Sequence, residues 1–363
     1  MRHREAMMGI EFTKMQGCGN DYVYINGFTQ KIAPDKKKDL VIKLSDRHFG
    51  IGSDGVIFIN PSDRADFEME MYNADGSRSE MCGNGIRCVA KYVYDHGMTD
   101  KCNITIESFG KIKPISITLK DGRAQLIRVD MGEPVLEAGL IPVRPELGRR
   151  GAGSTVPERE TKAGSGTAAT LTEDNEPVSK EIIDETETGM AAGIIREENR
   201  VINVPIMTDG REYRMTCVSM GNPHAVIFVD LTGRKDNDQD RPVSDPGGLT
   251  AFPDFKKEGG IENIGPLIEN HRDFPNRTNV EFVKIDDRNN VHMRVWERGT
   301  GETLACGTGC CATAVACVLN GLTDRSVTVH VPGGDILVEW DEGDNHVYMT
   351  GPAVTVFDGV VNV

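Results

Sequence analysis

The order of apolar and polar positions predicts a first set of strands and a helix in the N-terminal half. Apolar residues cluster or alternate over Tyr22–Ile25, Val56–Ile59 and 67–71, which is typical of strands. Four apolar residues at helical spacing predict a helix after Cys82, with Gly97 as its C-cap; they are Ile86, Val89, Ala90 and Val93.

The C-terminal half repeats this order. VSMGNPHAVIFVD is a Gly-Asn turn that leads into a strand, VHMRVWERGTGE is a strand and turn, and TLACGTGCCATAVACVLNG is a helix of small residues ending at Gly321. When Cys82 is aligned with Cys306, C-G-N-G-I-R-C lies on C-G-T-G-C-C-A and Asn73 lies on Glu297. Gly19-Asn20 matches Gly221-Asn222 separately. Matched turns in the same order indicate an internal duplication.

A segment of different composition separates the halves. It is rich in Gly, Ser, Thr, Pro and Glu, has no periodicity, and cannot bury enough apolar surface to offset its ordering entropy. We therefore expect a polar, flexible insertion over 142–200. The remaining chain divides into an N-terminal domain of 9–135 plus 347–363, which carries the Cys82 helix, and a C-terminal domain of 201–346, which carries the Cys306 helix.

Composition narrows the class of protein without naming it. The chain has 363 residues, enough for two domains, and its hydrophobic content is 38%. No apolar run is long enough for a membrane span, and the net charge of −15 argues against a broad nucleic-acid surface. The nine cysteines follow no secretion signal, so reduced thiols in a cytoplasm are expected. These features predict a cytoplasmic protein without membrane or nucleic-acid partners.

Two of the cysteines, Cys82 and Cys306, start Cys-Gly-x-Gly turns before helices. The glycines leave amide groups uncovered at the helix N-terminus, where the partial positive charge binds anions such as a carboxylate. We expect a cysteine at such a position to ionise more easily than a free thiol. Cys88, Cys310, Cys311 and Cys317 fall within the helices and are expected to be inert core residues.

A pair of thiols at matching positions suits stereoinversion at an α-carbon. One group removes the proton from one face while the other supplies a proton to the opposite face, and thiols can exchange these roles when the reaction reverses. The helix amides would stabilise charge that develops on the carboxylate. The residues thus predict Cys82 and Cys306 as an acid/base pair.

At these motifs the sequence resembles the diaminopimelate epimerases. The resembling segments are GCGNDYVYING, RHFGIGSDG, MYNADGSRSEMCGNGIRC, VSMGNPHAV, RTNVEFV, WERGTGETLACGTGCCA and GPAVTVFDG. The resemblance implies an α+β fold of two pseudo-symmetric domains, each a mixed β-sheet wrapped around a central helix, with the active site in the cleft between them. It also implies epimerisation of LL-diaminopimelate to the meso form, a step of lysine and possibly cell-wall precursor synthesis, without pyridoxal phosphate, metal or other cofactor.

The resemblance carries over to particular residues. Cys82 and Cys306 would be the catalytic thiols, with His224 and Glu297 nearby to set their protonation. Gly83, Asn84, Gly307 and Thr308 would hold the reacting carboxylate. The other substrate-binding positions would be Asn20, Asn73, Asn222, Asn279, Glu297 and Arg298. Gly55 stands where some family members have Gln, so a substrate contact there is in question. A small-molecule substrate and possibly a homodimer follow from the same resemblance.

Other classes of protein remain as alternatives. A proline-racemase-like enzyme of the same fold would not need the Glu297–Arg298 pair for a second amino-acid end. A zinc or redox protein lacks support because the chain has no C-x-x-C. GTGCCA and GCGNDY do not match a nucleotide-binding fingerprint. No lysine is singled out for a pyridoxal Schiff base.

Overall fold

The computed structural model describes residues 9–78, 83–144, 199–229 and 260–362. The predicted insertion over 142–200 therefore lies almost entirely outside the described residues. In the described ranges, no helix combines the length and apolar character needed to cross a membrane.

The first half of the chain is a mixed sheet with one helix on each side of its central strands. Its elements are β1 (Gly9–Gly17), β2 (Asn20–Asn26), α1 (Pro34–Ser45), β3 (Gly55–Asn60), β4 (Phe67–Asn73), α2 (Gly83–Asp95), β5 (Asn103–Ser108), β6 (Lys111–Lys120) and β7 (Arg123–Gly132). Neighbouring strands pair in sequence order from β1 to β7. The β2–β3 and β4–β5 pairs are parallel and the others are antiparallel.

The second half repeats the arrangement. Its elements are β8 (Val204–Thr208), β9 (Arg211–Ser219), β10 (Pro223–Phe228), α3 (Ile261–Glu269), β11 (Asn279–Ile285), β12 (Asn290–Glu297), β13 (Gly301–Thr303), α4 (Gly307–Leu319), β14 (Ser326–Val331), β15 (Gly334–Trp340) and β16 (Val347–Pro352). From β9 to β16 the order of antiparallel and parallel pairs is that of β1 to β7, with β10–β11 and β12–β14 parallel. The predicted duplication is thus a property of the fold.

Strand register fixes which residues of the two halves are equivalent. Tyr22 pairs with Gly55 across the first parallel pair, and His224 pairs with Asn279 across the second. Gly55 in turn lies opposite Asn73 at the end of β4. With Asn73 matched to Glu297 from the sequence, the position of Gly55 corresponds to that of Asn279.

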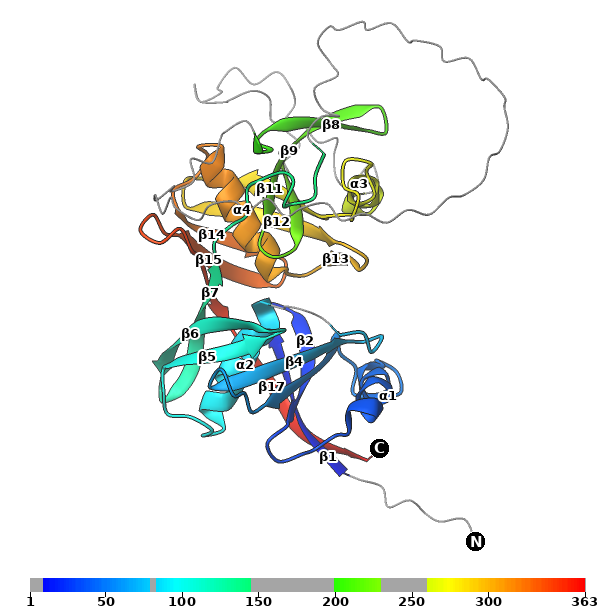
Figure 1. Ribbon diagram of the computed structural model, residues 1–363, viewed down its shortest axis with the longest axis vertical. Helices are drawn as coiled ribbons and strands as arrows, with labels where there is room; N and C mark the ends of the chain where they lie inside the picture. The colour runs from blue at the N-terminus through cyan, green and yellow to red at the C-terminus, as the bar shows by residue number, and fades with distance from the viewer. Residues whose placement is uncertain (1–8, 79–82, 145–198, 230–259, 363) are drawn as a thin grey trace, which may run out of the picture.

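The two halves are joined by strands that pass from one to the other. β16 pairs with β15 of the second half and with β7 of the first. The chain then continues as β17 (Val354–Asn362), which pairs with β1, and Figure 1 shows this red strand running into the lower half. In the opposite direction, Val135 beyond β7 bridges to Ser219 of β9. β16 therefore contacts both halves, and the assignment of 347–363 to the N-terminal domain stays a prediction.

The helices α2 and α4 form the centre of each half (Figure 1). The predicted helical positions Ile86, Val89, Ala90 and Val93 are fully buried. The small residues of α4 are buried from Gly307 to Cys317 because strands surround the helix closely. Cys88, Cys310, Cys311 and Cys317 lie in this core, which confirms that they are buried residues.

Candidate active site

The N-termini of α2 and α4 meet at a glycine from each helix. A Cβ atom added to Gly83 would lie 3.3 Å from Cα of Gly307, and one added to Gly307 would lie 3.2 Å from Cα of Gly83. Met349 of β16 packs against both glycines, 2.9 Å (Cε) and 3.1 Å (Sδ) from the two added atoms. A side chain at either position would be crowded, so glycine favours this approach, which brings the positive ends of two helices to one place. Two adjacent helix N-termini form a strong site for a carboxylate.

Cys82, the residue before Gly83, lies outside the described residues. Its counterpart Cys306 is the N-cap of α4 and is buried, with 7% of its surface exposed. Its Sγ lies 3.4 Å from the Oγ1 of Thr308 in the first turn of the helix. The structure therefore brings Cys306, Gly307 and Thr308 together with Gly83, as the sequence predicted for one side of the site.

The protonation of Cys306 differs from the expectation. Burial raises the pKa of this thiol well above its usual value, and the charges of Glu297 and Glu281 raise it further. The Thr308 hydroxyl and the Gly309 amide lower the pKa, but these effects are smaller. The expectation of an easily ionised cysteine was wrong for this residue because the sequence did not reveal the burial or the second carboxylate. The raised pKa favours the protonated thiol of Cys306, which can donate a proton.

Asn84 connects the first turn of α2 to the other half. It is 2% exposed, and its Nδ2 donates to the backbone oxygen of Ala305 at 3.2 Å, directly before Cys306. Its Oδ1 accepts a hydrogen bond of 2.9 Å from Arg87. Asn84 is therefore held by both halves, in a position that fixes the first turn of α2 beside Cys306.

Arg87 is a residue of the site that the sequence analysis passed over. It is completely buried, and its guanidinium donates to the backbone oxygens of Pro352 at 3.1 Å and Gly83 at 3.3 Å. None of its hydrogen-bond partners in the described chain is a carboxylate. A buried cation placed behind the start of α2 adds to the positive potential there. Its position in the quoted motif CGNGIRC, five residues after Cys82, was the available signal.

His224 belongs to a buried polar pair. Its Nδ1 lies 2.6 Å from Oε1 of Glu281 on the neighbouring strand β11, and its Nε2 lies 3.1 Å from Oδ1 of Asn222. His224 and Glu281 have no exposed surface. Glu281 was also missed, although an acid within the otherwise apolar strand sequence NVEFV is an unusual residue for a core. The structure places this carboxylate beside the first turn of α4, since its Oε1 would lie 2.8 Å from a Cβ on Gly309.

Glu297, Arg298 and Asn279 lie together at the ends of β11 and β12. Glu297 accepts a hydrogen bond of 2.5 Å from Thr303, and burial raises the pKa of its carboxyl. The buried Asn279 accepts from the backbone amide of Arg298 at 2.9 Å and donates to the backbone of Pro223 at 2.9 Å. Asn279 therefore sets the backbone position of Arg298, whose side chain is exposed.

Asn20 and Asn73 occupy strand ends of the first half. Asn20 donates to Asp54 at 2.7 Å, and Asp54 also accepts from Arg47 at 2.8 Å. Asn73 donates to Ser77 at 3.1 Å. Asp54, in the quoted segment GSDG, is a third residue that the sequence analysis did not assign. Its charge raises the pKa of Glu297, which indicates that Asp54 lies near the candidate site.

Gly55 has no room for a side chain. A Cβ at this position would lie 2.0 Å from the backbone oxygen of Tyr72 and 2.9 Å from the ring of Tyr22. A Gln side chain at this position would therefore require β4 to shift.

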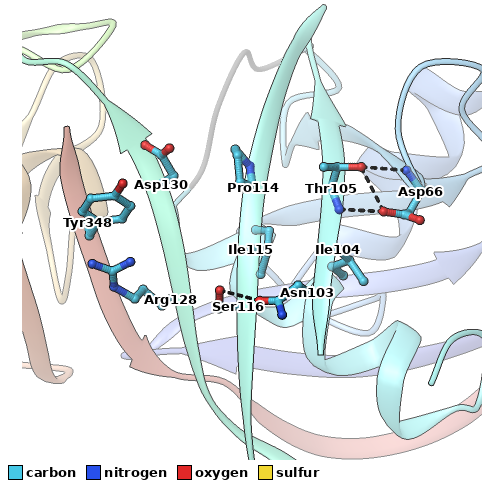
Figure 2. Close-up of a pocket in the computed structure, with 10 residues that line it drawn as sticks. All are labelled: Asp66, Asn103, Ile104, Thr105, Pro114, Ile115, Ser116, Arg128, Asp130 and Tyr348. Atoms are coloured by element: carbon cyan, nitrogen blue, oxygen red, sulfur yellow. Dashed lines mark hydrogen bonds between the residues drawn. The ribbon is translucent and has the colours of Figure 1, made fainter. Parts of the chain in front are cut away.

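A surface pocket of about 300 Å³ lies away from this site, on β5, β6, β7 and β16 (Figure 2). The figure shows its polar groups paired with each other, Ser116 with Asn103 and Thr105 with Asp66. Arg128 stacks on the ring of Tyr348, 3.6 Å from its centroid. None of the predicted site residues lines this pocket.

Solved structures of other proteins show the same class of fold. A PhzF-family phenazine biosynthesis protein from Bacillus anthracis superposes with a TM-score of 0.59 at 14% identity, covering 98% of this chain and 100% of that chain. A hydroxyproline epimerase from Agrobacterium vitis superposes with a TM-score of 0.56 at 14% identity, covering 97% and 91%. The chain thus has the two-domain α+β fold of these proteins, as predicted.

Sequence comparison identifies the family within this class. The diaminopimelate epimerase family model matches residues 12–137 and 248–356. The diaminopimelate epimerase of Agathobacter rectalis is 47% identical over 98% of this chain and 100% of its own, and that of Acetivibrio thermocellus is 45% identical over 98% and 99%. The chain belongs to the diaminopimelate epimerase family and is therefore an isomerase.

Proposed function

We propose that the chain interconverts LL- and meso-diaminopimelate by a two-thiol mechanism, with Cys82 and Cys306 on opposite faces of the substrate. The observation that carries the proposal is the contact between Gly83 and Gly307, because it joins two Cys-Gly helix starts at one anion site. Family membership and the names of the relatives support the substrate.

The geometry suggests how the substrate carboxylate is bound and how the proton on the α-carbon is transferred. The substrate carboxylate would bind the first-turn amides of α2 and α4, which involve Gly83, Asn84, Gly307 and Thr308. Helix amides would stabilise the charge that develops when the α-proton leaves. The neutral thiol of Cys306 suits the proton donor, while the thiolate of Cys82 would remove the proton from the other face.

The distal amino-acid end of the substrate needs complementary charges. We propose that Arg298 binds its carboxylate and that Glu297 accepts from its ammonium group. The asparagines of the two halves would supply further donors and acceptors; they are Asn20, Asn73, Asn222 and Asn279. His224 lies beside Asn222 and pairs with Glu281, and it would help to set the protonation of the thiols.

The experiment that tests this proposal is α-proton exchange in D₂O with LL-diaminopimelate. We expect deuterium incorporation with inversion by the wild type and loss of inversion in Cys82→Ala and Cys306→Ala. Inversion by either variant would contradict the two-thiol mechanism. Proline in the same assay tests the proline-racemase alternative, and exchange of proline without exchange of diaminopimelate would favour it.

We also propose a homodimer in the cytoplasm. β17 pairs only with β1 among the described strands, and it exposes Val354, Val356, Phe357 and Val360. An apolar edge strand is suited to pairing with a second copy. The reduced thiols expected from the sequence support the cytoplasm. Sedimentation of the wild type and Phe357→Lys tests the dimer, which the charged residue should dissociate.

A further inference from the structure

The pair formed by His224 and Glu281 exists in only one of the two halves. Strand register makes Tyr22 the counterpart of His224 and Ile57 the counterpart of Glu281. Tyr22 and Ile57 are buried core residues. In the N-terminal half these positions are occupied by an aromatic and an aliphatic side chain. The fold itself therefore does not require a charged pair there.

Burying this pair is costly, which indicates a chemical role. A carboxylate without exposed surface loses its hydration, and that loss is offset only by close partners. Glu281 has one such partner, His224 Nδ1 at 2.6 Å, and its other oxygen, Oε2, is buried without a hydrogen-bond partner among the described residues. Such a half-satisfied carboxylate beside the start of α4 is hard to explain by packing.

The contacts of the imidazole fix the orientation of its ring. Nδ1 lies 2.6 Å from the carboxylate of Glu281, and Nε2 lies 3.1 Å from the side chain of Asn222. Both ring nitrogens are thus held by side chains, with Nε2 directed at Asn222.

We propose that Glu281 is a positioning residue for epimerisation, whose carboxylate holds the ring of His224 with Nε2 directed at Asn222. The inference rests on the proposed two-thiol mechanism and deepens it. His224 lowers the pKa of Glu297, and Glu281 fixes the orientation of the His224 ring. The N-terminal half has no such pair, so the two sides of the site differ in their polar groups.

Other titratable groups surround Glu281 and share its electrostatic field. They come from β9, from the end of β12 and from α4 with its N-cap, and they are Cys217, Glu297, Cys306 and Cys310. The charge of Glu281 raises the pKa of each. Removing that charge therefore affects the thiols as well as His224, and the test must separate the two effects.

The test is a double-mutant cycle of Glu281→Gln and His224→Gln, assayed by epimerisation of LL-diaminopimelate across pH. We expect Glu281→Gln to lower kcat by roughly 10²-fold with little change in KM. The basic limb of its pH profile should move to lower pH, because the charge of Glu281 raises the pKa of Glu297 and Cys306. In the His224→Gln background the same change should have little further effect on kcat, since Glu281 acts through the imidazole.

Thr313→Val serves as the matched control. Thr313 is fully buried in α4, and among the described residues its hydroxyl bonds to Met293, so its loss should leave the pH profile unchanged. Nitrogen NMR of the His224 ring in the wild type and in Glu281→Gln provides a direct measurement of the contact. A changed Nδ1 resonance in the variant would support the proposal, and identical ring spectra would overturn it.

Two kinetic results would also overturn the role of Glu281. One is a wild-type kcat and an unshifted basic limb in Glu281→Gln. The other is an equal loss of kcat from Glu281→Gln with and without His224. The cysteine variants test the two-thiol mechanism separately, so its failure and the failure of this inference are distinguishable.

Discussion

Gly83 and Gly307 start two helices from different halves of the chain and lie against each other where those helices meet. Each is the residue after a cysteine of the proposed catalytic pair. A Cβ on either glycine would be crowded by the other helix and by Met349, which closes the space behind the contact. The spacing between the starts of α2 and α4 is therefore set by backbone packing.

Substitution at this contact should separate the helix starts. Gly307→Ala places a Cβ 3.1 Å from Met349 Sδ and 3.2 Å from Gly83, so we expect a loss of about 1–3 kcal/mol in the free energy of unfolding and a strong fall in kcat. Urea denaturation and the exchange assay measure these effects. Gly139→Ala is the control, because a Cβ there meets nothing within 4 Å. Wild-type activity in Gly307→Ala would show that the close approach is unnecessary.

The protonation of Cys306 predicts its reactivity. Burial and the charges of Glu297 and Glu281 raise the pKa of the thiol, so it stays protonated at neutral pH and should react slowly with iodoacetamide. The rate should increase as pH rises toward the raised pKa. Glu297→Gln removes one of the two charges and should accelerate alkylation at a given pH, as measured by peptide mass spectrometry. Glu302→Gln, whose carboxylate pairs with Arg294, is the control. Equal rates in all three proteins would contradict the prediction.

Arg87 should matter for both stability and activity. Arg87→Met leaves the backbone oxygens of Pro352 and Gly83 and the side chain of Asn84 without their donor, so we expect a loss of about 2 kcal/mol in the free energy of unfolding. The epimerase rate should fall because the first turn of α2 is no longer held. Arg288→Met is the control, since Arg288 is 62% exposed and its single ion pair contributes little. Equal urea midpoints for the two variants would show that Arg87 is dispensable.

His346 predicts a pH dependence of stability away from the site. A hydrogen bond to Asp130 at 2.9 Å raises the pKa of this histidine in the folded state. A raised folded pKa contributes stability that is present below the unfolded pKa and is lost as pH rises through the folded value. His346→Gln should therefore lower the melting temperature at pH 5.5, roughly one unit below the unfolded pKa, more than at pH 9. A loss that is the same at both pH values would contradict this.

Local sequence was sufficient for the elements that carry the chemistry. The periodicity of Ile86 and Val89 predicted α2, and Gly97 and Gly321 follow the ends of α2 and α4 with positive φ angles of 67° and 69°. These signals are local, because helical spacing and a glycine after the last turn depend on neighbouring residues alone. The motifs around Cys306 predicted the family for the same reason, and the family comparison confirmed it.

Long-range packing decided the properties that no short segment encodes. Three properties of the site depend on residues that are distant in sequence. They are the contact of Gly83 with Gly307, the raised pKa of Cys306 and the pairing of Glu281 with His224. In the sequence Arg87 is an ordinary helix residue, and only the tertiary structure shows that it is buried. The pKa of a group depends on its burial and on the charges around it in three dimensions. Spacing along the chain could therefore predict which residues react but not their protonation.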